Sequence, residues 1–151
     1  QLEAEQQKNE ALEQLKIILE KINGIVTVVT ADDENTINFI FANDKYYDML
    51  GCSKEQMEQE HLLFFNFIHP DDRKSVIEKT ITANIKQKSF SCTYRIIRYD
   101  GRTIWVQSNV SVSSIIGIDK PVQIGVSYDI TLHIQSNIID ADKEKNANLS
   151  L

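Results

Sequence analysis

Two alternating runs joined by Asp100-Gly101 constrain the fold of this chain more than any other feature. Residues 94–112 read YRIIRYDGRTIWVQSNVSV, so apolar and polar side chains alternate on both sides of the dipeptide. Such alternation is typical of half-buried strands, and Asp-Gly favours a tight turn with positive φ. A further alternating run, GVSYDIT, ends at Thr131. The region therefore predicts consecutive antiparallel strands over about 89–99, 102–114 and 121–130.

The rest of the chain predicts helices around a first pair of strands. Residues 1–23 contain no Pro or Gly and are rich in Glu, Gln, Lys and Leu, which favours a helix that ends at Gly24. His69-Pro70-Asp71-Asp72 marks the start of a second long helix, because Pro suits a first turn and Asp complements a helix N-terminus. The other expected elements are strands over 25–30 and 36–42, a turn over 32–35, a short helix capped by Asn43 or Asp44 and ending at Leu50, helical turns over 53–68, and a helix after Thr131 that frays from about Asp142.

This order fits an α+β domain with a five-stranded antiparallel sheet and short helices on one face. With FIFANDKYYDMLG and IHPDDR upstream, the hairpin and its Asp129-Ile130-Thr131 ending closely resemble a PAS sensory domain, over about residues 24–131. The resemblance implies a PAS-like fold, with an amphipathic helix over 1–23 and an exit helix over 132–151. It also implies a signal-input and dimerisation module rather than an enzyme.

Composition limits the possible partners and surroundings. The 151 residues are 42% hydrophobic, enough for one domain with a core and some extension. A formal charge of -6 argues against nucleic acid as the main partner, because phosphate binding needs a basic patch. No run is long enough to span a membrane, and Cys52 and Cys92 form no CxxC pattern. We expect a cytoplasmic domain with reduced thiols, cut from a longer signalling protein because the chain begins within a helical pattern.

Strand alternation predicts which side chains face the helices. One face of each strand should bound any internal cavity, and the other should point away. One face of the strand over 36–42 should carry Ile37, Phe39 and Phe41. In the three later strands the predicted inward residues are Phe90, Cys92, Tyr94 and Ile96; Ile104, Val106, Ser108, Val110 and Val112; and Val122, Ile124, Val126 and Tyr128.

A small-molecule pocket is one hypothesis for this interior. Cys92, Tyr94 and Ser108 are polar or polarisable residues predicted to face inward, and Asn66 lies among phenylalanines expected on the opposite wall. A few polar groups in an apolar cavity are typical of ligand sites. Alternatively, these side chains bond nearby backbone inside a filled core, as buried polar groups usually do.

The resemblance also bears on cofactors. Flavin-binding light sensors of this superfamily carry a reactive cysteine in the motif Asn-Cys-Arg-Phe-Leu-Gln, whereas the matching region here, Phe64-Phe65-Asn66-Phe67-Ile68, has none. Haem-binding relatives carry a ligand histidine in the long helix, and residues 71–86 contain no histidine. We therefore predict neither flavin nor haem.

Metal binding and catalysis are weaker hypotheses. His69, Asp71 and Asp72 could be read as metal ligands, but the start of a helix explains the same residues. His61, His69 and His133 have no evident nucleophile and orienting acid beside them, and no glycine-rich loop could cradle a phosphate. We predict no metal site and no catalytic site.

The N-terminal helix carries an apolar stripe that needs a partner. Leu12, Leu15, Leu19 and Ile22 recur at spacings of three and four, as on one face of a helix. The stripe could pair with its twin in a homodimer. It could also cover Trp105 on the outer face of the sheet, and the two arrangements can hold together.

The end of the last strand is a candidate for signal coupling. Related PAS domains use the Asp-x-Thr turn, here Asp129 to Thr131, as the junction to an effector. A carboxylate and a hydroxyl there can accept bonds from unpaired helix N–H groups, although an ordinary cap uses the same bonds. By family resemblance the effector would be the histidine kinase of a two-component system or a diguanylate cyclase. The competing hypothesis is a ligand-free PAS module that serves as a dimerisation spacer.

Overall fold

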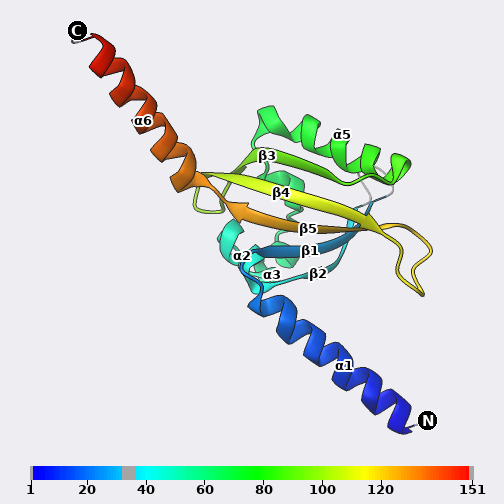
Figure 1. Cartoon of the computed structure of the whole chain (residues 1–151). Helices are drawn as coiled ribbons and strands as arrows, with labels where there is room; N and C mark the ends of the chain where they lie inside the picture. Colours follow the sequence, from blue (N-terminus) through cyan, green and yellow to red (C-terminus); the bar gives the residue numbers. More distant parts are fainter. Residues whose placement is uncertain (1, 32–36, 150–151) are drawn as a thin grey trace.

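The structure is a computed structural model that describes residues 2–31 and 37–149, and Figure 1 shows the arrangement of its elements. The expected turn over 32–35 lies outside the described residues. Most predicted boundaries agree with the structure to within two residues. The elements are α1 (Leu2–Lys21), β1 (Ile25–Ala31), β2 (Ile37–Ala42), α2 (Asp44–Leu50), α3 (Lys54–Gln59), α4 (Phe64–Phe67), α5 (Pro70–Lys86), β3 (Phe90–Ile97), β4 (Thr103–Ser113), β5 (Val122–Asp129) and α6 (Thr131–Leu149).

The strands form one five-stranded antiparallel sheet in the order β2-β1-β5-β4-β3. The first and last strands of the chain are neighbours in the middle of the sheet, where Ile25 pairs with Ser127. Asp100-Gly101 closes the β3–β4 hairpin, and Gly101 has a φ of 88°. This arrangement confirms the predicted α+β fold.

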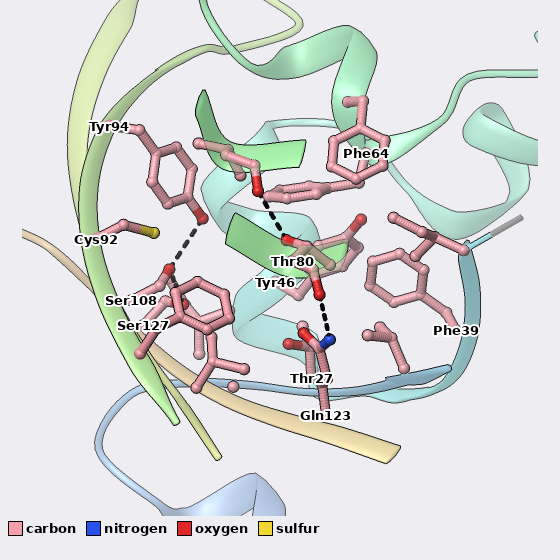
Figure 2. Close-up of a pocket in the computed structure, with 18 of the residues that line it drawn as sticks. Thr27, Phe39, Tyr46, Phe64, Thr80, Cys92, Tyr94, Ser108, Gln123 and Ser127 are labelled. Carbon is pink, nitrogen blue, oxygen red and sulfur yellow. Dashed lines mark hydrogen bonds between the residues drawn. The ribbon is translucent and has the colours of Figure 1, made fainter. Parts of the chain in front are cut away.

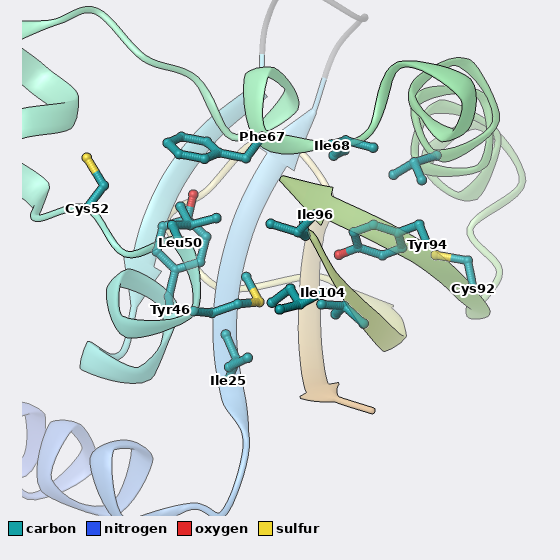
Figure 3. Packing of buried hydrophobic residues seen from close by; sticks show 13 residues of the cluster. Ile25, Tyr46, Leu50, Cys52, Phe67, Ile68, Cys92, Tyr94, Ile96 and Ile104 are labelled. Carbon is teal, nitrogen blue, oxygen red and sulfur yellow. The ribbon is translucent and has the colours of Figure 1, made fainter. Parts of the chain in front are cut away.

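The short helices and α5 lie on one side of the sheet and enclose the core with it (Figure 1). Leu50 of α2, Ile68 after α4 and Ile96 of β3 have no exposed surface. Figure 3 shows these side chains converging from helix, loop and strand. Full burial of one such side chain contributes roughly 1.5–3 kcal/mol, so the contacts between helices and sheet stabilise the fold.

The inward face of β5 was predicted wrongly. Ser127 pairs with Ser108, and Gly125 pairs with Val110. Paired residues share a face of the sheet, so Ser127, Gly125 and Gln123 face the helices. The apolar alternates Val122, Ile124, Val126 and Tyr128 therefore lie on the outer face. The segment before β1 crosses that face, since a Cβ on Gly24 would lie 3.1 Å from side-chain atoms of both Val126 and Tyr128.

Phe41 lies on the opposite face of β2 from Ile37 and Phe39, contrary to the prediction that all three share a face. An irregularity in the pairing of β1 and β2 places Val28 opposite Phe41 but Val29 opposite Phe39, so Ile40 is an extra residue in β2. Such a bulge reverses the alternation beyond it. Ile37 and Phe39 line the cavity, and Phe41 shares the outer face with Val28.

Asn43 anchors the chain around α1 rather than capping α2 with its side chain. It holds the N-cap position, but its side chain makes no capping bond. Its Oδ1 accepts from the Val26 N–H at 3.1 Å, and its Nδ2 donates to the Gly24 carbonyl at 3.0 Å. Asn43 has no exposed surface, so it satisfies backbone groups inside the protein that water cannot reach.

The two terminal helices extend away from the body of the domain (Figure 1). α1 buries none of its residues, and Leu12 and Leu15 are each about half exposed. The helix therefore does not cover Trp105, which instead lies beside the Arg95 guanidinium, 5.4 Å from the ring centre. α6 continues to Leu149 rather than fraying near Asp142.

The sequence pattern predicts an apolar face of α5 made of Val76, Ile77, Thr80, Ile81 and Ile85. Val76 and Thr80 are buried as predicted, and Ala83 joins them. Ile85 is 78% exposed, contrary to this prediction. Among the described residues, no helix combines the length and apolar character needed to cross a membrane.

Candidate ligand cavity and coupling turn

A cavity of about 80 Å³ lies between the inner face of the sheet and helices α2, α4 and α5 (Figure 2). All five strands contribute to its wall, because each has one face turned toward the helices. The lining is mostly apolar, with a few polar groups, as in many ligand sites. The lining residues are Ile25, Thr27, Val29, Ile37, Phe39, Tyr46, Met49, Phe64, Phe65, Val76, Thr80, Phe90, Cys92, Tyr94, Ser108, Val110, Gln123, Gly125 and Ser127.

Three hydroxyl groups form a bonded cluster on the sheet side of the cavity. The Tyr94 and Ser108 hydroxyl oxygens are 2.9 Å apart, and those of Ser108 and Ser127 are 2.7 Å apart. β3, β4 and β5 each supply one member, and all three side chains are buried. The structure thus places the predicted residues Tyr94 and Ser108 in the cavity and joins them to Ser127 (Figure 2).

Of the two remaining predicted pocket residues, one lies in the cavity wall and the other does not. Cys92 lies in the cavity wall, two positions before Tyr94 on the same face of β3. Asn66 does not, and that expectation was wrong. Its side chain is exposed, and its Oδ1 accepts from the Leu63 N–H at 2.7 Å, which satisfies the start of α4. Phe64 and Phe65 of the same helix line the cavity instead.

Burial keeps the titratable groups of the cavity protonated at neutral pH. Desolvation raises the pKa of Tyr94 far above its usual value, outweighing the opposing effect of its hydrogen bonds to the serine hydroxyls. Desolvation likewise raises the pKa values of Tyr46 and of the Cys92 thiol. The wall is therefore uncharged.

Sequence reasoning missed the polar residues of β5. Gln123 is only 2% exposed, and its Nε2 donates to the Thr80 carbonyl at 2.7 Å and to Asn84 Oδ1 at 2.8 Å. It thereby ties the middle of the sheet to α5 across the cavity. The only signal in the sequence was the position of Ser127, which a correct β4–β5 register places opposite Ser108.

Aromatic side chains separate the cavity from a surface groove. Phe39, Tyr46 and Phe64 line both spaces, and the groove beyond them has a volume of about 610 Å³. The ring centres of Phe39 and Tyr46 are 5.3 Å apart, and those of Phe39 and Phe64 are 6.2 Å apart. These three rings therefore form a wall that the cavity and the groove share.

The residues considered for metal binding have structural contacts. His69 is the N-cap of α5, where its Nδ1 accepts from the Asp71 N–H at 3.1 Å. Asp72 instead pairs with Arg95, as described below. Over residues 2–31 and 37–149, the structure brings together no group of three or more His, Cys, Asp or Glu side chains that could hold a metal ion.

The predicted coupling turn is a bonded junction between β4, β5 and α6. Asp129 Oδ1 accepts from the Thr131 N–H at 2.9 Å and from the Thr131 hydroxyl at 2.6 Å. The Thr131 hydroxyl was expected to accept a bond from an N–H of the helix. It accepts instead from the backbone N–H of Trp105, at 2.9 Å. The turn is thus fixed to the neighbouring strand as well as to its own helix.

A second set of contacts links this region to α5. Asp72 Oδ1 and Oδ2 accept from Arg95 Nη2 at 2.7 Å and Nε at 2.9 Å, a bidentate ion pair. Asp72 Oδ2 also accepts from the Arg95 backbone N–H at 2.8 Å. Because the guanidinium lies beside the Trp105 ring, these contacts connect the start of α5 with β3 and β4.

Comparisons with known proteins agree with this architecture. A sequence model of the PAS fold matches residues 39–117, more than half of the 151 residues. No curated protein sequence matches the chain at a significant level. Many solved structures match the chain, and three of them are described below.

The PAS domain of an HTR-like protein from Haloarcula marismortui has a TM-score of 0.65 at 16% identity, covering 86% of this chain and 100% of that one. The N-terminal domain of a diguanylate cyclase with PAS/PAC sensor from Marinobacter aquaeolei has a TM-score of 0.58 at 19% identity, covering 74% and 98%. A sensory box histidine kinase/response regulator from Burkholderia thailandensis has a TM-score of 0.60 at 16% identity, covering 91% and 98%. At these identities the likeness concerns the fold, whereas the matching sequence model concerns the family. The chain therefore belongs to the PAS fold family, whose domains are sensory and regulatory modules rather than catalysts.

Proposed function

We propose that this PAS domain senses a small molecule in its central cavity and relays the change through α6 to a C-terminal effector. One observation carries the proposal: β4 contributes Ser108 to the cavity and, three residues earlier, holds the first residue of α6 through the Trp105 N–H. A shift of β4 on ligand binding would therefore move the start of α6.

The names of two structural neighbours support a proposal for the class of the effector. Similar folds occur in a diguanylate cyclase and in a histidine kinase/response regulator, as their names state. We propose that one of these two effector classes follows α6 in a longer cytoplasmic protein that acts as a homodimer. The exposed stripe of α1 supports the homodimer, because a helix with no buried residue leaves its leucines to a partner.

The competing function is a dimerisation spacer with no ligand. The small volume of the cavity and the mutual bonds of its hydroxyls favour that function. The two functions differ in what a filled cavity would do. A spacer tolerates filling, whereas a sensor loses its response.

The variant Val110→Phe tests this difference in the full-length protein. Val110 lines the cavity from β4, so an aromatic ring there would occupy the space. Sensing predicts that effector output no longer depends on the stimulus, while the domain stays folded by circular dichroism. Ser111→Phe on the exposed face of the same strand is the matched control. A normal stimulus response from Val110→Phe would favour the spacer, as would native mass spectrometry that finds a dimer without any retained molecule.

A further inference from the structure

The wall of the cavity is uncharged throughout its described part. Its described lining residues include no Lys, Arg, His, Asp or Glu, and its tyrosines and Cys92 stay protonated. A charged ligand would lose its hydration there without gaining an opposite charge, which costs far more than a neutral group loses. The occupant that fits this wall carries no net charge.

The hydroxyl cluster is the polar feature on the sheet side of the cavity. The hydroxyl oxygens of Tyr94 and Ser108 are 2.9 Å apart and those of Ser108 and Ser127 are 2.7 Å apart, and Tyr94 interacts with both serines. Each hydroxyl can rotate, donate one hydrogen bond and accept others. An uncharged occupant with a hydrogen-bonding group can therefore bond to the cluster.

Tyr46 adds a hydroxyl group to the helical wall. The residue is only 3% exposed, and it lines both the cavity and the surface groove beyond it. Figure 2 shows Tyr46 on the helical side, across the cavity from the hydroxyl cluster.

The volume sets the size of the occupant. A single water needs about 10–15 Å³, and a cavity of about 150 Å³ holds benzene. The 80 Å³ here lies between these limits. It suits an organic molecule with only a few non-hydrogen atoms.

From the charge, polarity and volume of the cavity, we propose that it binds a compact, uncharged organic molecule whose hydrogen-bonding group meets the hydroxyl cluster of Tyr94, Ser108 and Ser127. The inference rests on the proposed sensory function and names the ligand class of the same cavity. Carbonyl compounds and ethers belong to this class, whereas carboxylates, phosphates and amines do not.

Three probes of equal size test the class. 2-Butanone carries a carbonyl, 2-methyl-1-butene replaces its oxygen with a methylene group, and propionate replaces one of its methyl groups with a charged oxygen. Each is titrated into the methyl-labelled chain, with the Val76 and Val110 methyl resonances as readout, because both residues line the cavity. We expect 2-butanone to bind at least tenfold more tightly than propionate. Equal or tighter binding of propionate, or no binding of any probe, would overturn the proposal.

The role of the cluster is tested by removing its hydroxyls together, in the variant Tyr94→Phe/Ser108→Ala/Ser127→Ala. Deleting all three leaves no polar group of the cluster unpaired, so the fold is expected to persist. The affinity ratio of 2-butanone to 2-methyl-1-butene should fall about fivefold, the size of one neutral hydrogen bond. Thr93→Val/Ser111→Ala, which removes hydroxyls from exposed positions of β3 and β4, is the control and should keep the ratio. An unchanged ratio in the triple variant would contradict the assignment.

The outcomes separate the ligand class from the sensory function. If the probes behave as expected but leave effector output unchanged in the full-length protein, the ligand class stands and the sensory function fails. If output depends on a stimulus and on Val110 while the probes show no preference, the sensory function stands and the ligand class is wrong.

Discussion

The Thr131 hydroxyl accepts a hydrogen bond from the backbone N–H of Trp105 at 2.9 Å, which joins the first residue of α6 to the strand β4. The Trp105 carbonyl makes the reciprocal contact, accepting from the Ile130 N–H at 2.8 Å. The backbone N–H and C=O of Trp105 in β4 therefore both hold the turn between β5 and α6. The direction in which α6 leaves the domain depends on the position of this strand.

Loss of this junction should change signal output more than stability. We expect Asp129→Ala and Thr131→Ala each to cost about 1 kcal/mol, as for an N-cap, and to leave the isolated domain folded. In the full-length protein each should alter how effector output depends on the stimulus. Thr103→Ala, at an exposed position of β4, is the control. An unaltered stimulus dependence in both variants would reduce the turn to an ordinary cap.

The stripe of α1 predicts a homodimer that charge can disrupt. Leu15 is 49% exposed and Leu19 is half-buried, so an apolar surface remains that a second copy could bury. Sedimentation should show a dimer for the wild type and a monomer for Leu15→Glu/Leu19→Glu. Gln7→Glu/Gln14→Glu adds the same charge outside the stripe and should stay dimeric. A wild type that is monomeric at high concentration would refute the dimer.

The ion pair of Asp72 and Arg95 predicts a stability that depends on pH. Bonds from Arg95 hold the pKa of Asp72 below its usual value of 3.8, against a smaller opposing effect of burial. A carboxyl whose folded pKa is depressed stabilises the fold above its unfolded pKa, and this contribution disappears as the pH falls through the folded value. The contribution is thus complete at pH 7 and decreases below about pH 4.

Urea unfolding of Asp72→Asn measures this contribution. At pH 7 we expect a loss of about 2 kcal/mol, typical of hydrogen bonds to a partly buried charged group. The loss should shrink as the pH falls below 3.8, because the wild-type carboxyl then becomes neutral as well. Asp71→Asn is the matched control, since that neighbouring side chain is 77% exposed. An equal loss at every pH would show that the pair contributes no charge-dependent stability.

Asn43 should be one of the most sensitive polar positions in the chain. Asn43→Ala would leave the Val26 N–H and the Gly24 carbonyl without their partner inside the protein. Each buried unpaired group costs about 1–3 kcal/mol, so we expect a total loss of roughly 3 kcal/mol in chemical denaturation. Asn38→Ala, at an exposed position of β2, should cost little. A loss below about 1 kcal/mol for Asn43→Ala would show that water replaces the amide.

The purified domain should be colourless. The region that would carry a flavin-reactive cysteine, residues 64–68, has none, and the long helix α5 has no histidine for haem. Absorbance spectroscopy of freshly purified protein tests this expectation. A visible band with flavin or haem structure would show that the cavity holds a chromophore by other contacts.

The local pattern of the sequence predicted strands and faces well where one face was apolar. Alternation in β3 correctly turned Phe90, Cys92, Tyr94 and Ile96 inward. In β5 the same rule failed, because the chain after α1 covers the apolar outer residues while Gln123 and Ser127 face the cavity. Periodicity separates the two faces of a strand. When both faces are covered, it does not tell which of them faces the helices.

The positions of single polar residues were predictable on strands but not at the starts of helices. Tyr94 and Ser108 could be placed in the cavity because their strands have a regular period. Asn66 and Asn43 could not, since their side chains bond backbone groups whose positions depend on helix starts and chain crossings. If a short helix begins one residue earlier or later, its side chains point in other directions. In a strand, pairing with the neighbouring strands fixes the direction of each side chain.

The sequence by itself determined the order of the elements, the α+β class and the resemblance to PAS domains, because helix and strand periods and turn residues are local properties. Tertiary structure alone decided that Ser127 completes the hydroxyl cluster, that Arg95 lies between Asp72 and Trp105, and that Thr131 bonds to β4. These contacts join residues from separate strands and helices. They arise only when strand register and helix docking bring distant segments within hydrogen-bonding distance, and no local pattern encodes that distance.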